Sequence, residues 1–121
     1  MSSAENNLLE VLGKNHVSLI AGEEASVVLP SYSSGGDGHG VRYTDEFHLE
    51  LFRKIGGMSR LPVGDGFWYD GERLVHDVNF FVKFTATLRE LDKILVLIAN
   101  HYRDEKCFYV KHGNICFCYS R

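Results

Sequence analysis

The stretch Gly56–Phe84 reads GGMSRLPVGDGFWYDGERLVHDVNFFVKF, and it decides the fold. Asp70-Gly71 predicts a hairpin turn, because glycine accepts a positive φ and the Asp side chain supports the turn locally. In the second strand of this hairpin, successive side chains point to opposite faces. One face carries Val78, Phe80, Val82 and Phe84, and the other carries Asp77, Asn79, Phe81 and Lys83. The stretch therefore predicts two antiparallel strands with one core face and one mixed face.

A helix is predicted on each side of this hairpin. Thr44 caps the first, in which Phe47 and Leu51 share an apolar face, and Gly56-Gly57 ends it. Alternation of Phe47, Leu49 and Leu51 also permits a strand, but the cap and the glycine pair favour the helix. Thr87 and Glu90 form a capping-box pair at the start of the second helix, which continues to about Tyr102.

The remaining elements lie at the two ends of the chain. At the N-terminus, Ser3 caps a helix over 4–12, and a strand over 16–20 is expected to form a hairpin with a strand over 25–32. A glycine-rich loop fills 33–40. The C-terminal residues predict a second hairpin, with strands over 107–110 and 115–119.

From Ala25 onward the predicted order is strand, helix, strand, strand, helix, strand. Short connections fold this order into a four-stranded antiparallel sheet with both helices on one face, the ferredoxin-like βαββαβ plan. We therefore expect a single α+β domain over 1–121. Its core is 25–112, an N-terminal extension with a helix and a strand occupies 1–24, and an extra strand occupies 113–121.

The composition disfavours several classes of partner and several cellular compartments. The chain has 121 residues, a net charge of −3 and a pI of about 6.0, which disfavours a nucleic-acid or membrane-surface partner. No apolar run approaches the roughly 20 residues that span a bilayer. Residues 1–7 lack the basic start and apolar middle of a signal peptide. Three cysteines do not suggest a secreted disulfide framework, so we expect a cytoplasmic, reduced protein.

The order of elements and the turn residues resemble those of small bacterial, phage and gene-cassette proteins of unknown function. The matching features are a strand over 27–31, a loop at 35–40, Gly56-Gly57, the hairpin 66–71 and Asp77. The resemblance covers roughly residues 25–112. It implies the ferredoxin-like fold, an origin on a mobile genetic element and a dimer formed through the sheet. It implies no reaction.

Two groups of residues suggest a phosphate-binding or a zinc-binding site, and in each the pattern is incomplete. The glycines at 35–40 have no following Lys, so a surface loop is favoured over a phosphate site and no cofactor is expected. Cys107, Cys116 and Cys118 share one face of the last hairpin, where His101 or His112 would have to join them to bind zinc. Half-buried reduced thiols are favoured, and no metal is expected. A Cys107–Cys118 disulfide depends on the register.

Catalysis and RNA binding each have one candidate motif. His76 and Asp77 are the candidate acid/base residues, although neighbours in a strand point to opposite faces and cannot form a dyad with each other. Residues 81–84 match the end of the RNA-recognition consensus, but the preceding positions fail and the chain is acidic. The sequence therefore favours a non-enzymatic module, with a small enzyme as the alternative.

The leading hypothesis is self-association through the sheet face that the helices leave open. Trp68, Phe81, Tyr109 and Cys118 are the expected contact residues, because apolar side chains alternate onto both faces of strands whose helices cover only one. The expected partner is a second copy, and a small molecule or another protein is a further possibility.

Overall fold

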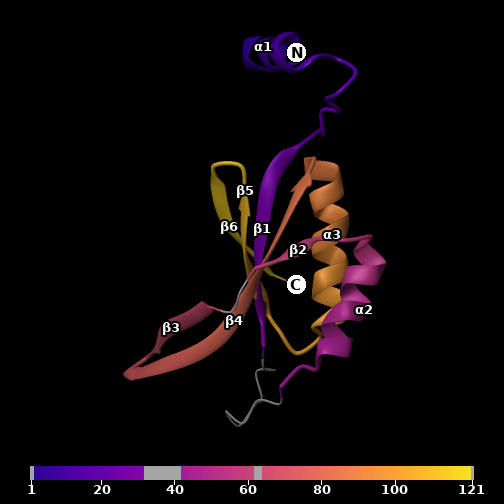
Figure 1. Cartoon of the computed structure of the whole chain (residues 1–121). Coiled ribbons are helices and arrows are strands. Elements are labelled where there is room, and N and C mark those ends of the chain that lie inside the picture. Colours follow the sequence, from indigo (N-terminus) through magenta and orange to yellow (C-terminus); the bar gives the residue numbers. More distant parts are fainter. Residues whose placement is uncertain (1, 32–41, 62–63, 121) are drawn as a thin grey trace.

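The computed structural model describes residues 2–31, 42–61 and 64–120. Its fold is α+β, with a six-stranded antiparallel sheet and the helices α1, α2 and α3 (Figure 1). The helices are α1 (Ser3–Leu12), α2 (Asp45–Ile55) and α3 (Leu88–His101). The strands are β1 (Glu23–Pro30), β2 (Ser59–Arg60), β3 (Gly64–Asp70), β4 (Arg73–Ala86), β5 (Cys107–His112) and β6 (Ile115–Ser120).

The sheet order confirms the ferredoxin-like prediction. The strands lie in the order β2-β4-β1-β5-β6, and β3 pairs with the outer part of β4. The second strand of the plan is thus divided into β2 and β3, and β6 is the predicted extra strand at the opposite edge. Both crossover helices, α2 and α3, lie side by side on one face of the sheet, and none of the described helices lies over the other face (Figure 1).

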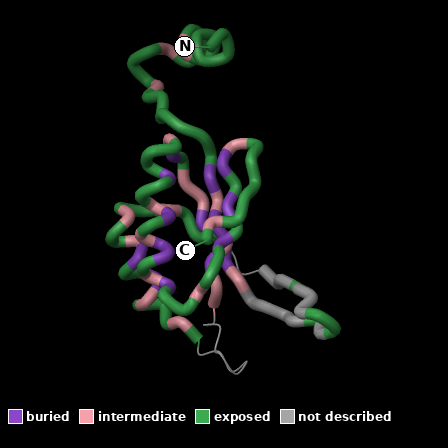
Figure 2. The backbone as a smooth tube through the Cα atoms, turned by 180° about the vertical axis from the view of Figure 1, so that it is seen from behind, coloured by how far each residue is buried: buried purple, intermediate pink, exposed green. Residues whose placement is uncertain are grey.

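The core lies between this pair of helices and the central strands (Figure 2). Val27 in β1 stands between Val82 of β4 and Val110 of β5, and all three side chains are buried. Alternation continues along β1, where Ala25 and Leu29 are also buried. The helices complete the core with Leu51, Leu91, Leu95, Ile98 and Ala99. Since strand side chains alternate, the residues between these buried positions face the helix-free side.

Capping explains where the helices begin. The Thr44 hydroxyl accepts a hydrogen bond from the Phe47 amide at 3.1 Å, and α2 ends at Gly56 in the left-handed region, so the helix interpretation of 45–55 is correct. At α3, the Thr87 hydroxyl and the Glu90 carboxylate accept reciprocal backbone hydrogen bonds, as the capping-box pattern predicts. The cap of α1 is Ser2 rather than Ser3, so α1 begins one residue earlier than expected.

The predicted strand over 16–20 is wrong, and so is its hairpin with β1. Residues 14–16 form a turn and 17–20 belong to no helix or strand. The reason is topological, because β4 and β5 already occupy the two edges of β1. At Gly22, φ is +109° and a Cβ would lie 2.3 Å from the Ala86 carbonyl carbon, so a glycine is required where the chain enters β1.

Two segments extend beyond the main body of the fold. β3 and the outer half of β4 form a two-stranded arm, whose turn residues are Gly71 and Glu72 rather than the predicted Asp70-Gly71 (Figure 1). Helix α1 has no buried residue and stands apart from the sheet, at the end of the segment 13–22 (Figures 1 and 2). Among the residues that the structure describes, no helix is long and apolar enough to cross a membrane.

Candidate functional site

The helix-free face of the sheet carries an apolar groove, which we call the sheet groove, with a volume of about 460 Å³. The groove crosses β4, β1, β5 and β6. It is lined by Ser26, Val28, Phe81, Tyr109, Val110, Lys111, Cys116, Phe117 and Cys118. Phe81 and Tyr109 are 37% and 47% exposed, which is high for aromatic side chains in the middle of a sheet. The groove is therefore an apolar surface that the described part of the chain leaves uncovered.

Among the residues that line the groove, one carries a charge, Lys111. Lys83 of β4 forms an ion pair with Glu24 of β1 on this face, at 2.9 Å. Lys111 lines the groove and has no ion pair with any residue that the structure describes. The surface thus combines aromatic and aliphatic groups with one uncompensated ammonium group, a combination suited to an apolar partner that carries a carboxylate.

The last hairpin has the predicted faces, and its register is now defined. Tyr109 stands opposite Cys118, and Lys111 stands opposite Cys116. Cys107 stands opposite Ser120, so it lies diagonal to Cys118 rather than directly across from it. All three thiols are free and exposed. Burial, together with the neighbouring Cys118 thiol, raises the pKa of the Cys107 thiol, so Cys107 is held in its less nucleophilic, protonated form.

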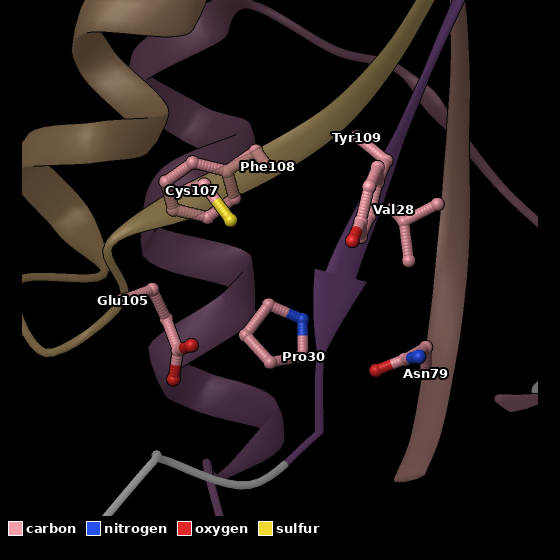
Figure 3. A pocket seen from close by; sticks show the side chains of 7 residues that line it. All are labelled: Val28, Pro30, Asn79, Glu105, Cys107, Phe108 and Tyr109. Carbon is pink, nitrogen blue, oxygen red and sulfur yellow. The ribbon is translucent and has the colours of Figure 1, made fainter. Parts of the chain in front are cut away.

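A smaller polar notch of about 100 Å³ adjoins the sheet groove where β1 ends (Figure 3). The Glu105 carboxylate lies on one side of Pro30 and the Asn79 amide on the other, with Cys107 and the Tyr109 side chain above them (Figure 3). Val28 and Tyr109 line both the notch and the groove, so the two hollows adjoin each other. A ligand with an apolar body and a polar or cationic end would therefore fit across them.

Glu105 is linked to the helical layer by a hydrogen bond. The Tyr43 hydroxyl donates to the Glu105 carboxylate at 3.3 Å. Burial, followed by the charges of Glu105 and Asp104, raises the pKa of Tyr43, so its phenol keeps the proton that it donates. The hydrogen bond holds the Glu105 carboxylate at the edge of the notch.

Behind the notch, on the helix side, His48 and Tyr102 form a buried polar pair. The His48 Nδ1 atom lies 2.7 Å from the Tyr102 hydroxyl oxygen. Burial, with a further contribution from Arg60, lowers the pKa of His48 to about 4, and burial raises the pKa of Tyr102. Both side chains are therefore uncharged near neutral pH. Aromatic rings surround them, including Phe80 at 4.5 Å from the His48 ring, which indicates a packing role.

The structure brings three of the four expected contact residues onto one surface: Phe81, Tyr109 and Cys118 all line the sheet groove. Trp68, His76 and Asp77 belong to the arm formed by β3 and β4. Their side chains lie outside the described part of the chain, as do all atoms of the glycine-rich loop at 35–40.

The possible zinc ligands do not come together. His101 Nε2 bonds the Phe47 carbonyl oxygen on the helix side. His112 is buried on the same side, where its Nε2 atom donates to the Ala86 carbonyl oxygen at 2.8 Å. Both rings are thus on the opposite face of the sheet from the thiols. Within the described ranges, no three His, Cys, Asp or Glu side chains are placed to share a metal ion.

Sequence analysis missed Glu105 and Asn79 as candidate site residues. Glu105 lies in the short connection between α3 and β5, and Asn79 alternates with core residues of β4. The only signal available was positional, because polar side chains near the end of β1 converge on one edge once the strand order is known. His48 is also buried, with 3% of the residue exposed.

Comparisons with known proteins add a likeness of fold. No protein-family model matches the chain, and no curated protein matches its sequence. A solved structure of a phage SAM lyase in complex with S-methyl-5'-thioadenosine superposes with a TM-score of 0.55 at 11% identity, over 87% of this chain and 95% of that one. A phage SAM lyase in its apo state gives a TM-score of 0.55 at 13% identity, over 86% and 97%. At these identities the likeness concerns the fold alone.

Proposed function

We propose that this protein is a cytoplasmic binding module whose subunits associate through the sheet groove. The supporting observation is the exposure of Phe81 and Tyr109 beside a cavity of about 460 Å³ on the face without helices. Burying apolar area is worth roughly 25 cal/mol per Å², so a second subunit that covers these side chains gains several kcal/mol before the cost of association.

The shape of the chain also favours association. A two-stranded ribbon is at best marginally stable alone in water, yet β3 and the outer half of β4 form such an arm. Phe67 and Leu74 on this arm are 61% and 57% exposed. A neighbouring subunit that contacts the arm would cover these side chains.

Sedimentation analysis at micromolar concentration tests the proposal. We expect the wild-type protein to sediment as a dimer or larger assembly, and a Phe81→Glu variant to shift toward the monomer by placing a charge in the groove. Leu88→Glu is the matched control, because Leu88 is exposed on α3 away from this face. A wild-type monomer of 13.7 kDa at these concentrations would overturn the proposal.

A second candidate function is an enzyme that cleaves SAM or a related sulfonium nucleoside. Its support is the fold likeness to phage SAM lyases together with the polar notch. A sulfonium centre is cationic, so it would be attracted to the Glu105 carboxylate and to the face of the Tyr109 ring. His76 and Asp77 remain the alternative acid/base residues for such an enzyme.

This second candidate has a direct assay. The protein is incubated with SAM, and the release of S-methyl-5'-thioadenosine is followed by chromatography. If the protein is active, Glu105→Gln should lower the rate of product release at least tenfold. Asp92→Asn, which removes an exposed carboxylate from α3, should leave this rate unchanged. If His76→Gln or Asp77→Asn abolishes the rate while Glu105→Gln does not, the catalytic group belongs to the arm. Absence of product with the wild-type protein rejects the candidate.

A further inference from the structure

We infer that helix α1 of one subunit docks into the sheet groove of a second copy of this chain. The inference rests on the proposed self-association and specifies what covers the open face. Each subunit would lend its N-terminal helix to its neighbour, in an exchange related by two-fold symmetry. In such an exchange each contact occurs twice, once for each subunit, so the dimer buries twice the apolar area that one docked helix buries.

Helix α1 is a well-capped helix that packs against none of the other described helices and strands closely enough to bury a residue. The Ser2 hydroxyl accepts a hydrogen bond from the Glu5 amide at 3.1 Å, and the Gly13 amide bonds the Leu9 carbonyl oxygen at the other end. None of its residues is buried, and Val11 and Leu12 are 73% and 56% exposed. A ten-residue helix is marginal in water by itself, so its apolar side needs a surface to cover it.

The dimensions of α1 and the groove agree. Ten residues of α-helix are about 15 Å long. The groove crosses four adjacent strands, and three spacings between neighbouring strands span about 14 Å. Leu8, Leu9 and Leu12 fall on one side of the helix at helical spacing, and this side would cover an apolar strip of the groove that includes Val28, Phe81 and Tyr109.

The charges are complementary as well. Glu5 occurs one turn before Leu8 and Leu9, so its carboxylate lies beside the apolar stripe. Within α1 the charged residues are Glu5 and Glu10, and no basic residue occurs there. In the groove, Lys111 lacks an ion pair among the described residues. A docked α1 would bring a carboxylate to this ammonium group.

The geometry of the connection favours a second copy over the helix's own sheet. The segment 13–22 continues outward from the end of β1, and α1 stands away from its own helix-free face (Figure 1). Gly22 lies against the backbone of Ala86 at this exit, where a Cβ would come within 2.3 Å of the Ala86 carbonyl carbon. The exit therefore presents α1 to a neighbouring molecule while the groove of its own subunit stays open.

Site-directed crosslinking of the full-length protein tests this arrangement. In a Leu12→Cys variant the introduced thiol lies on the apolar stripe, where docking would bring it near Cys116 or Cys118. The matched control is Glu10→Cys, because residue 10 points to the opposite side of α1. Diamide serves as the oxidant and takes up the two electrons and two protons released when two thiols form a disulfide. Tryptic peptides are then mapped by mass spectrometry.

We expect the Leu12→Cys variant to give at least fivefold more disulfide-linked dimer than Glu10→Cys. The linking peptides should join residue 12 to Cys116 or Cys118, and the band should disappear when both native cysteines are changed to Ser. Equal yields from the two variants, or a link within a single chain, would overturn the inference. Sedimentation of these variants and of the wild-type protein separates the two hypotheses. If the proteins are dimers but the specific link is absent, only the docking of α1 is rejected. If the wild-type protein is a monomer, self-association is rejected too.

Discussion

The Nδ1 atom of His48 lies 2.7 Å from the hydroxyl oxygen of Tyr102, and this contact joins the middle of α2 to the C-cap residue of α3. Both side chains are almost fully buried, with exposed fractions of 3% and 0%. The pair thus fixes the packing of the two helices over the sheet through one hydrogen bond in an aromatic environment. Its position makes the stability of the fold depend on the ionisation of a single imidazole.

We expect the free energy of unfolding to fall as the pH is lowered from 6.5 to 4. The pKa of His48 is lowered from 6.5 to about 4 in the folded protein, chiefly by burial. In this window the unfolded chain binds the proton more tightly than the folded protein does, so acid favours unfolding. The stabilisation by neutral His48 is complete above pH 6.5, and about 3 kcal/mol of it is lost by pH 4, since each pKa unit corresponds to roughly 1.4 kcal/mol.

Urea unfolding across this pH range measures the effect. The control is the double variant His48→Phe with Tyr102→Phe, which removes the titrating ring without leaving a buried hydroxyl unpartnered. Its stability should vary less with pH than that of the wild-type protein. Parallel pH profiles for the two proteins would show that His48 does not have the lowered pKa.

Tyr102→Phe should destabilise the protein by about 1–3 kcal/mol at neutral pH. The substitution removes the hydroxyl and leaves His48 Nδ1 buried without its hydrogen-bond partner, which incurs the desolvation cost of that atom. Thermal or urea unfolding gives the difference. Tyr109→Phe is the comparison, because Tyr109 is exposed on the helix-free face and its hydroxyl should matter much less for folding.

Gly22→Ala should destabilise the fold by more than about 2 kcal/mol, whereas Gly57→Ala should cost less. Both glycines have a positive φ, +109° and +123°, so both substitutions strain the backbone. Only at position 22 would the added Cβ meet backbone, at 2.3 Å from the Ala86 carbonyl carbon. The denaturant midpoints of the two variants measure the cost of this steric clash. Equal losses of stability would contradict the close approach of Gly22 to the Ala86 backbone.

Thiol labelling should report the covering of the sheet groove. Cys116 and Cys118 line the groove, whereas Cys107 lies in the adjoining notch. Alkylation with iodoacetamide, followed by peptide mass spectrometry, should slow at Cys116 and Cys118 as the protein concentration is raised. Labelling of Cys107 should change less. Rates that do not depend on concentration at all three thiols would indicate that association leaves the groove open.

Local chemistry determined much of the fold before any tertiary contact was known. The capping pattern at Thr87 and Glu90, the cap at Thr44 and the alternation in β4 each specify an element from neighbouring residues alone. The same period-two alternation placed Tyr109 and Cys118 on one face, because a hairpin with a short turn fixes its register locally. These features needed only spacings of two to four residues.

The tertiary structure decided what depends on distant partners. The strand expected over 16–20 has the right composition, but β4 and β5 occupy both edges of β1, so no place in the sheet was left for it. Glu105 and Asn79 meet at the notch because the strand order brings together residues 26 positions apart. Burial of His48 arises in the same way, from α3 and β4 closing over it. Composition and period describe one element at a time, whereas a site is formed by the elements that pack against one another.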